Sequence, residues 1–164
     1  MKKLIIVLIS ILLLILDNSV MPFLAIHSAF PSLLFTFAIC FSLVGSKEDA
    51  VFVGVISGLL QDIYFSYGFG LNALTNMLIC LIVAHFGSGI FKKRVIVPVS
   101  VVFVTTIVKH LAIYCGLMLL DHTGYIYNVI YVAIYNAVIA AITYKFIFKF
   151  ADSENVSDKW RIRW

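Results

Sequence analysis

The chain is poor in charged residues, in proline and in tryptophan. Only 12% of its 164 residues are charged, and it has 3 prolines and 2 tryptophans. About a quarter of the residues are charged in a typical soluble domain, so this composition excludes a water-soluble globule. A hydrophobic content of 63% excludes a disordered chain. A lipid bilayer is the solvent that suits this composition, and the sequence predicts an integral membrane protein of one domain.

The chain also lacks the motifs of the common catalytic and metal sites. Its cysteines, Cys40, Cys80 and Cys115, lie inside apolar stretches at spacings that match no metal motif. The histidines form no HExxH motif, and there is neither a GxSxG sequence nor a phosphate-binding loop. We therefore expect no enzyme activity, no cofactor and no metal.

Six apolar stretches have the length and composition of helices that cross a bilayer. The first follows a basic start, as in a signal peptide, but Asp17-Asn18-Ser19 replaces a cleavage site, which favours an uncleaved span. The fold class predicted is all-α, with one transmembrane domain over residues 1–150 and a cytoplasmic tail over 151–164. The spans are expected at about 4–21, 31–45, 50–65, 71–91, 95–120 and 125–148.

The positions of the basic residues predict the orientation. Every Lys and Arg except Lys109 lies at the amino terminus, in the loops near 45–49 and 92–94, or from Lys145 onward. The alternate loops, near 22–30, 66–70 and 121–124, have no Lys or Arg. The positive-inside rule therefore places both termini in the cytoplasm. The net charge of +4 then reflects topology, and no nucleic-acid partner is expected.

Part of this basic set is expected to contact anionic lipid at the cytoplasmic surface. In the tail, two Trp residues flank two Arg residues in a pattern typical of a surface anchor, and a frayed terminus is the alternative. The expected lipid-surface anchor consists of Lys92, Lys93, Arg94, Trp160, Arg161, Arg163 and Trp164.

Polar residues on five of the spans fall at one depth. A rise of 1.5 Å per residue places each of them about 18 to 22 Å from the cytoplasmic boundary. This intramembrane polar layer consists of Asp17, Asp62, Asn76, Lys109 and Asn136. Lys109 is too deep to reach the interface, so it should face the protein interior and pair with a carboxylate, Asp62 first and Asp17 second. An ion pair that fixes packing, a partner-docking site and a ligand cavity all remain open.

A stripe of small residues precedes Asp62 on the third span. Gly54, Gly58 and Asp62 are four residues apart and share one helix face. Small residues at this spacing allow two helices to approach closely in lipid. The face is expected either to hold spans together or to accept the helix of a partner.

The same stretch resembles a known family. Gly54-Val55-Ile56-Ser57-Gly58-Leu59-Leu60-Gln61-Asp62, followed by Gly68-Phe69-Gly70-Leu71-Asn72-Ala73-Leu74, is similar to the rod shape-determining protein MreD family, which has a G-x-x-x-G-L-x-x-D helix and then a glycine turn. Lys2-Lys3, Pro31 and Lys92-Lys93-Arg94 also match. The family often has Pro-Asp where this chain has Pro31-Ser32, and Lys109 matches no family pattern. The resemblance implies helix-packing or partner-docking roles for Gly54, Gly58, Asp62, Gly68, Gly70 and Asn72.

The resemblance also implies a function and partners. Members are non-enzymatic subunits of the cell-elongation machinery in the bacterial plasma membrane. They work with the bitopic protein MreC, the MreB filament and the RodA–transpeptidase pair that builds peptidoglycan. The expected role is that of a scaffold for these proteins.

The family architecture is similar to that of the S components of energy-coupling-factor vitamin transporters, which supplies an alternative function. S components dock through small residues, often A-x-x-x-A, low on the first span. The inner first span here, from Leu4 to Leu12, has no such stripe. The polar layer favours this alternative only if it lines a ligand cavity.

Overall fold

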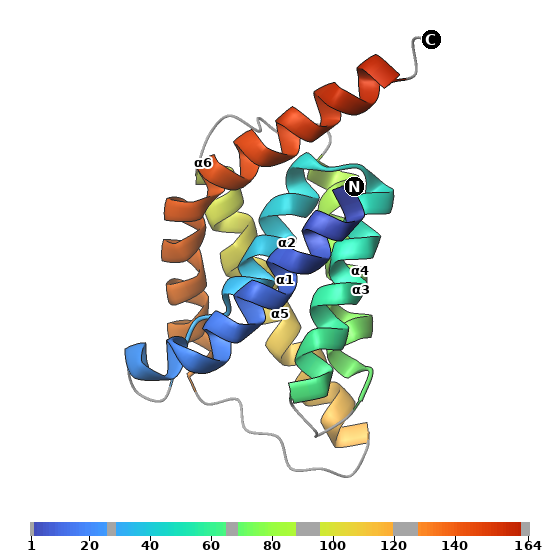
Figure 1. Cartoon of the computed structure of the whole chain (residues 1–164). Coiled ribbons are helices and arrows are strands. Elements are labelled where there is room, and N and C mark those ends of the chain that lie inside the picture. The colour runs from blue at the N-terminus through green and yellow to red at the C-terminus, as the bar shows by residue number, and fades with distance from the viewer. Residues whose placement is uncertain (1, 26–28, 65–68, 88–95, 120–127, 162–164) are drawn as a thin grey trace.

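The computed structural model describes residues 2–25, 29–64, 69–87, 96–119 and 128–161, with side chains as far as Lys149 in the last range. These residues form α-helices and one short 3-10 helix and no β-strand, as the all-α prediction requires (Figure 1). In chain order the elements are α1 (Lys2–Ser19), η1 (Met21–Leu24), α2 (Leu33–Val44), α3 (Lys47–Tyr64), α4 (Leu71–Gly87), α5 (Ile96–Leu119) and α6 (Val129–Arg161).

The chain begins and ends at the same end of the bundle. Figure 1 shows the start of α1 and the end of α6 at the top of the view, which we call the termini end. The helices run alternately away from this end and back to it. α6 differs from the prediction, because it continues as helix past Phe148 to Arg161 and leaves the bundle at the termini end.

Among the described residues, two helices are long and apolar enough on their own to cross a membrane, over Ile96–Met118 and Val129–Lys149. α2 and α4 are apolar but shorter. With 12 residues, α2 is about 18 Å long, well short of a hydrocarbon core of about 30 Å.

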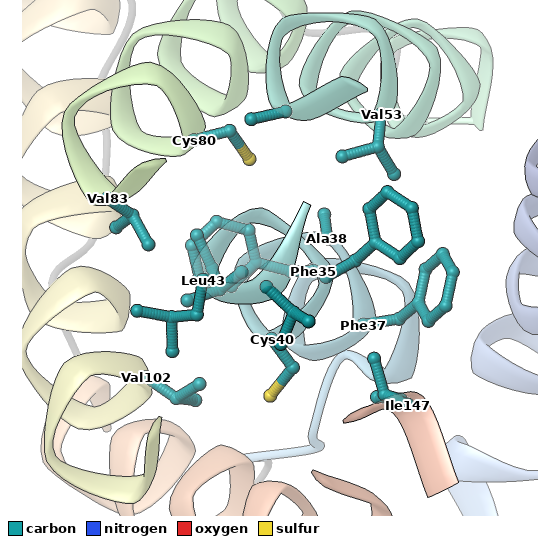
Figure 2. Packing of buried hydrophobic residues seen from close by; sticks show 14 of the residues in the cluster. Phe35, Phe37, Ala38, Cys40, Leu43, Val53, Cys80, Val83, Val102 and Ile147 are labelled. Atoms are coloured by element: carbon teal, nitrogen blue, oxygen red, sulfur yellow. The ribbon is translucent and has the colours of Figure 1, made fainter. Parts of the chain in front are cut away.

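The short helix α2 lies at the centre of the bundle. Every residue from Leu34 to Val44 is buried, and α2 contacts each of the other five α-helices. Figure 2 views α2 along its axis, with Phe35, Phe37 and Cys40 pointing outward toward the surrounding helices. A helix that is apolar on all sides is expected inside a protein or in lipid, and here its neighbours bury it.

The glycine stripe of α3 faces α4 of the same chain. A Cβ atom on Gly54 would lie 2.9 Å from the Asn76 carbonyl oxygen and the Met77 Cα. A Cβ on Gly58 would lie 2.6 Å from the Ala73 nitrogen, and closer still to the Ala73 Cα and the Asn72 oxygen. The backbones therefore touch, and of the two expected uses of this face, packing within the chain is the one observed.

The turn before α4 depends on a glycine. Gly70 has a φ of +100°, a conformation that residues with a side chain rarely adopt. It directly precedes the first turn of α4, where Asn72 lies. Gly68, the other glycine expected here, lies outside the described residues.

We predict that Gly58→Ala destabilises the bundle by about 1–3 kcal/mol or more, because the added methyl group meets rigid backbone. Gly116→Ala is the matched control within α5, since a Cβ there meets chiefly the flexible end of Leu71, at 2.8 Å. Thermal unfolding of the detergent-purified proteins measures the difference. Equal midpoints for the two variants would contradict the close approach of α3 and α4.

Candidate functional site

Polar side chains from all six α-helices meet in one hydrogen-bonded group, which we call the polar cluster. Four of its members come from the predicted layer, and the others are serine, threonine and glutamine residues that the depth argument missed. Ser57, Asn76, Thr106 and Asn136 are almost completely buried, and Lys109 is only 6% exposed. The polar cluster consists of Asp17, Ser32, Ser57, Gln61, Asn76, Thr106, Lys109 and Asn136.

Ser32 connects four helices at the start of α2. As the N-cap residue, its Oγ accepts from the Phe35 amide at 3.2 Å. The same hydroxyl donates to Asp17 Oδ2 at 3.1 Å and accepts from Gln61 Nε2 at 3.1 Å. Its backbone N–H donates to Asn136 Oδ1 at 2.8 Å. One serine therefore joins the ends of α1 and α2 to α3 and α6.

Asp17, near the end of α1, caps α2 from outside that helix. Its Oδ1 accepts from the Leu33 amide at 2.7 Å and its Oδ2 from the Leu34 amide at 3.1 Å. The first N–H groups of a helix have no partner within the helix and carry a partial positive charge. A carboxylate there satisfies both the hydrogen bonds and the charge.

Asp62, near the end of α3, makes the same arrangement with α4. Its carboxylate accepts from the amides of Asn72, at 3.0 Å, and Ala73, at 2.9 Å. The Asn72 side chain adds a third hydrogen bond of 3.1 Å to the same carboxylate. Asp62 and Asn72, both in the predicted packing set, thus fix the hairpin of α3 and α4.

Among the described residues, the hydrogen-bond partner of Lys109 is an amide oxygen and not the expected carboxylate. The Lys109 Nζ donates to Gln61 Oε1 at 2.6 Å and lies 4.5 Å from the centre of the Phe35 ring. The expected ion pair with Asp62 is wrong for a geometric reason: Asp62 is turned toward the start of α4, and its neighbour Gln61 faces Lys109.

Gln61 and Asn136 complete the connections. Gln61 Oε1 also accepts from Asn76 Nδ2 at 3.0 Å, and that Asn76 nitrogen lies 3.3 Å from Ser57 Oγ. Asn136 Nδ2 donates to Thr106 Oγ1 at 3.2 Å. Hydrogen bonds therefore lead from Lys109 through Gln61, Ser32 and Asn136 back to α5, a closed ring over four helices.

The four members of the polar cluster that were not predicted differ in how clearly the sequence indicates them. Ser32 directly precedes an apolar run, as an N-cap residue does, so its capping role was readable. Gln61, Ser57 and Thr106 are uncharged and common in helices, and nothing in their spacing singled them out.

Several predicted site residues lie outside what the structure describes. Of the expected lipid-surface anchor, the loop at 92–94 and residues 163 and 164 fall outside the described ranges, and Trp160 and Arg161 are placed only as backbone of α6. Within the described residues, no group of three or more His, Cys, Asp or Glu side chains could hold a metal ion.

The fold and the polar cluster together define a class of protein: a helical bundle with apolar helices of membrane-crossing length and a buried polar interior. The family model of the rod shape-determining protein MreD matches residues 1–153, and the chain belongs to this family of membrane proteins. The match covers the polar cluster and both capping aspartates. Comparison with curated proteins and with solved structures gave no match.

We predict that Gln61→Leu destabilises the protein more than Lys109→Met does. Gln61→Leu leaves the buried Lys109 amine without its hydrogen bond, a loss of about 1.5–3 kcal/mol for a hydrogen bond to a charged group. Lys109→Met removes the charge together with its desolvation cost, and Gln61 keeps its bonds to Asn76 and Ser32.

The double variant provides the check. With Lys109→Met present, adding Gln61→Leu should cost clearly less than it does alone, as a double-mutant cycle of unfolding midpoints measures. Additive effects of the two substitutions on the unfolding midpoint would argue against the hydrogen bond between Lys109 and Gln61. The charge swap Asp62→Lys with Lys109→Asp should restore nothing, because it places a cation at the start of α4.

Proposed function

We propose that the chain is a non-enzymatic membrane subunit of the bacterial cell-elongation complex, which scaffolds an MreC-like bitopic protein and, directly or through it, MreB and the RodA–transpeptidase pair. The observation that carries the proposal is the match of the MreD family model over residues 1–153, which includes nearly the whole bundle. The family acts in rod-shape determination.

We also propose that all six α-helices are embedded in the bacterial plasma membrane with both termini in the cytoplasm. Lys3, Lys47, Lys145 and Lys149 lie at the termini end of the bundle, on helices that begin or finish there. Basic residues at one end agree with the positive-inside rule. The short helix α2 fits this arrangement because its neighbours separate it from lipid.

The hydrogen bonds within the polar cluster favour the scaffold function and argue against that of an S component. A transporter subunit needs polar groups that face a cavity and are free to bind substrate. Here the side chains of Asp17, Gln61 and Asn136 are bonded to other residues of the chain. Such bonds fix the relative positions of helices, as a scaffold requires.

Detergent co-purification of the tagged chain from a rod-shaped bacterium tests the proposal. We expect the wild-type chain to recover an MreC-like bitopic protein, and Gly58→Leu, which separates α3 from α4, to lose it. Gly116→Ala is the control that should retain it. Recovery of a coupling-factor ATPase with no bitopic shape protein would overturn the scaffold in favour of the transporter.

A further inference from the structure

The side chains on the outside of the bundle are sorted by type along its length. Among the described residues, the large exposed aromatic side chains lie at the two ends, and we call these two sets the aromatic belts. They consist of Phe86 and Phe146 at the termini end, and of Phe23, Phe30, Tyr64, Phe69 and Tyr131 at the opposite end (Figure 1). Between the belts the large exposed side chains are aliphatic, such as Leu78, Val108 and Val138. Aromatic residues at both interfaces with aliphatic residues between them are typical of a protein surface in a bilayer.

The two aromatic belts are closer together than the two faces of an average hydrocarbon core. Along α6, about 22 Å of helix separates Tyr131 from Phe146. Along α3, about 24 Å separates the charged Glu48 from Tyr64. α4, which has an aromatic belt at each end, is about 26 Å long over its 17 residues. Any inclination of these helices shortens the distance across the bilayer further, and an average core measures about 30 Å.

Contacts within the chain fix the length of the hairpin of α3 and α4. At the end opposite the termini, Asp62 caps the start of α4, and Gly70 shapes the turn before it. At the termini end, Ser46 Oγ accepts from the Asp49 amide at 3.2 Å and caps the start of α3. Irregular backbone is not stable where it is exposed to hydrocarbon. The hairpin therefore cannot cross a thicker core without placing one of these turns in lipid.

α5 is longer than the other helices between the belts. Its 24 residues extend over about 36 Å. Figure 1 shows α5 inclined across the bundle, with its end beyond the end of α3. A helix that is longer than the local hydrocarbon thickness accommodates the excess by tilting. The length of α5 is therefore compatible with a thin core.

We propose that the outer surface of the bundle fits a thin bilayer, with a hydrocarbon core of about 22–26 Å next to the protein. The lipids that suit this surface are distinguished by the length of their acyl chains. Short chains reach from belt to belt, whereas longer chains must compress around the protein, so a membrane of average thickness becomes thinner there. The inference rests on the proposed embedding in the membrane and adds to it the class of lipid that the chain prefers.

Relative lipid affinities of the reconstituted full-length chain test the proposal. Leu78→Trp, in a background of Trp160→Tyr and Trp164→Tyr, places a single tryptophan on the outside of α4, where Leu78 is 45% exposed. Brominated phosphatidylcholine quenches its fluorescence, and competition with unbrominated phosphatidylcholines gives their relative affinities. We expect dimyristoleoyl and dipalmitoleoyl chains to bind on the order of twofold more tightly than dieicosenoyl chains, since each ångström of mismatch carries a cost.

The positions of the two aromatic belts have their own test on α4. In the same background and in dioleoyl phosphatidylcholine, Phe69→Trp and Phe86→Trp should each be quenched most by lipids that are brominated close to the headgroup. Leu78→Trp, midway between them, is the matched control and should be quenched most by lipids that are brominated near the ends of the chains. All three side chains are exposed, so the substitutions leave the packing of the bundle intact.

Two results would overturn the thin-bilayer proposal and leave the chain a membrane protein. One is the highest affinity for dioleoyl or dieicosenoyl chains. The other is quenching of Phe69→Trp or Phe86→Trp chiefly by the deeply brominated lipids, because that ring would then lie inside the hydrocarbon core. A lack of quenching by every brominated lipid at all three positions would overturn the proposed embedding itself, and this proposal with it.

Discussion

The half-buried start of α2 is the constraint on which the rest of the structure depends. The other helices cover much of the first turn of α2, and its free amide groups find their partners within the protein. Asp17 supplies two acceptors and Ser32 a third, and both residues also bond to each other. Because Ser32 further contacts Gln61 and Asn136, this end of α2 fixes the positions of α1, α3 and α6 together.

The start of α4 is capped in the same way as the start of α2. In both hairpins an aspartate near the end of the first helix caps the start of the second, Asp17 for α2 and Asp62 for α4. Gly58 brings α4 close enough for the Asp62 carboxylate to reach its amides. The glycine and aspartate of the family motif thus serve one local structure, and the polar cluster then ties the two hairpins to α5 and α6.

The features that depend only on position along the chain could be predicted from the sequence. Apolar lengths and the positions of basic residues indicate where helices lie, and depth alone assigns Asp17, Asn76, Lys109 and Asn136 to one level. The partner of Lys109 could not be predicted in this way. Gln61 and Asp62 differ by about 100° around α3, so the rotation of that helix decides which of them faces Lys109. Rotation depends on packing against α4, which the sequence does not specify.

The central claim is most directly tested by the unfolding free energy of Ser32→Ala, measured in a bilayer or mild detergent beside Ser100→Ala. Ser100 donates only to the Ile96 carbonyl of its own helix at an exposed position. The account predicts a loss of about 1–3 kcal/mol for Ser32→Ala, from the missing cap and the unpaired Gln61 amide, and less than about 0.5 kcal/mol for Ser100→Ala. Equal and small losses would contradict the claim that the start of α2 organises the bundle.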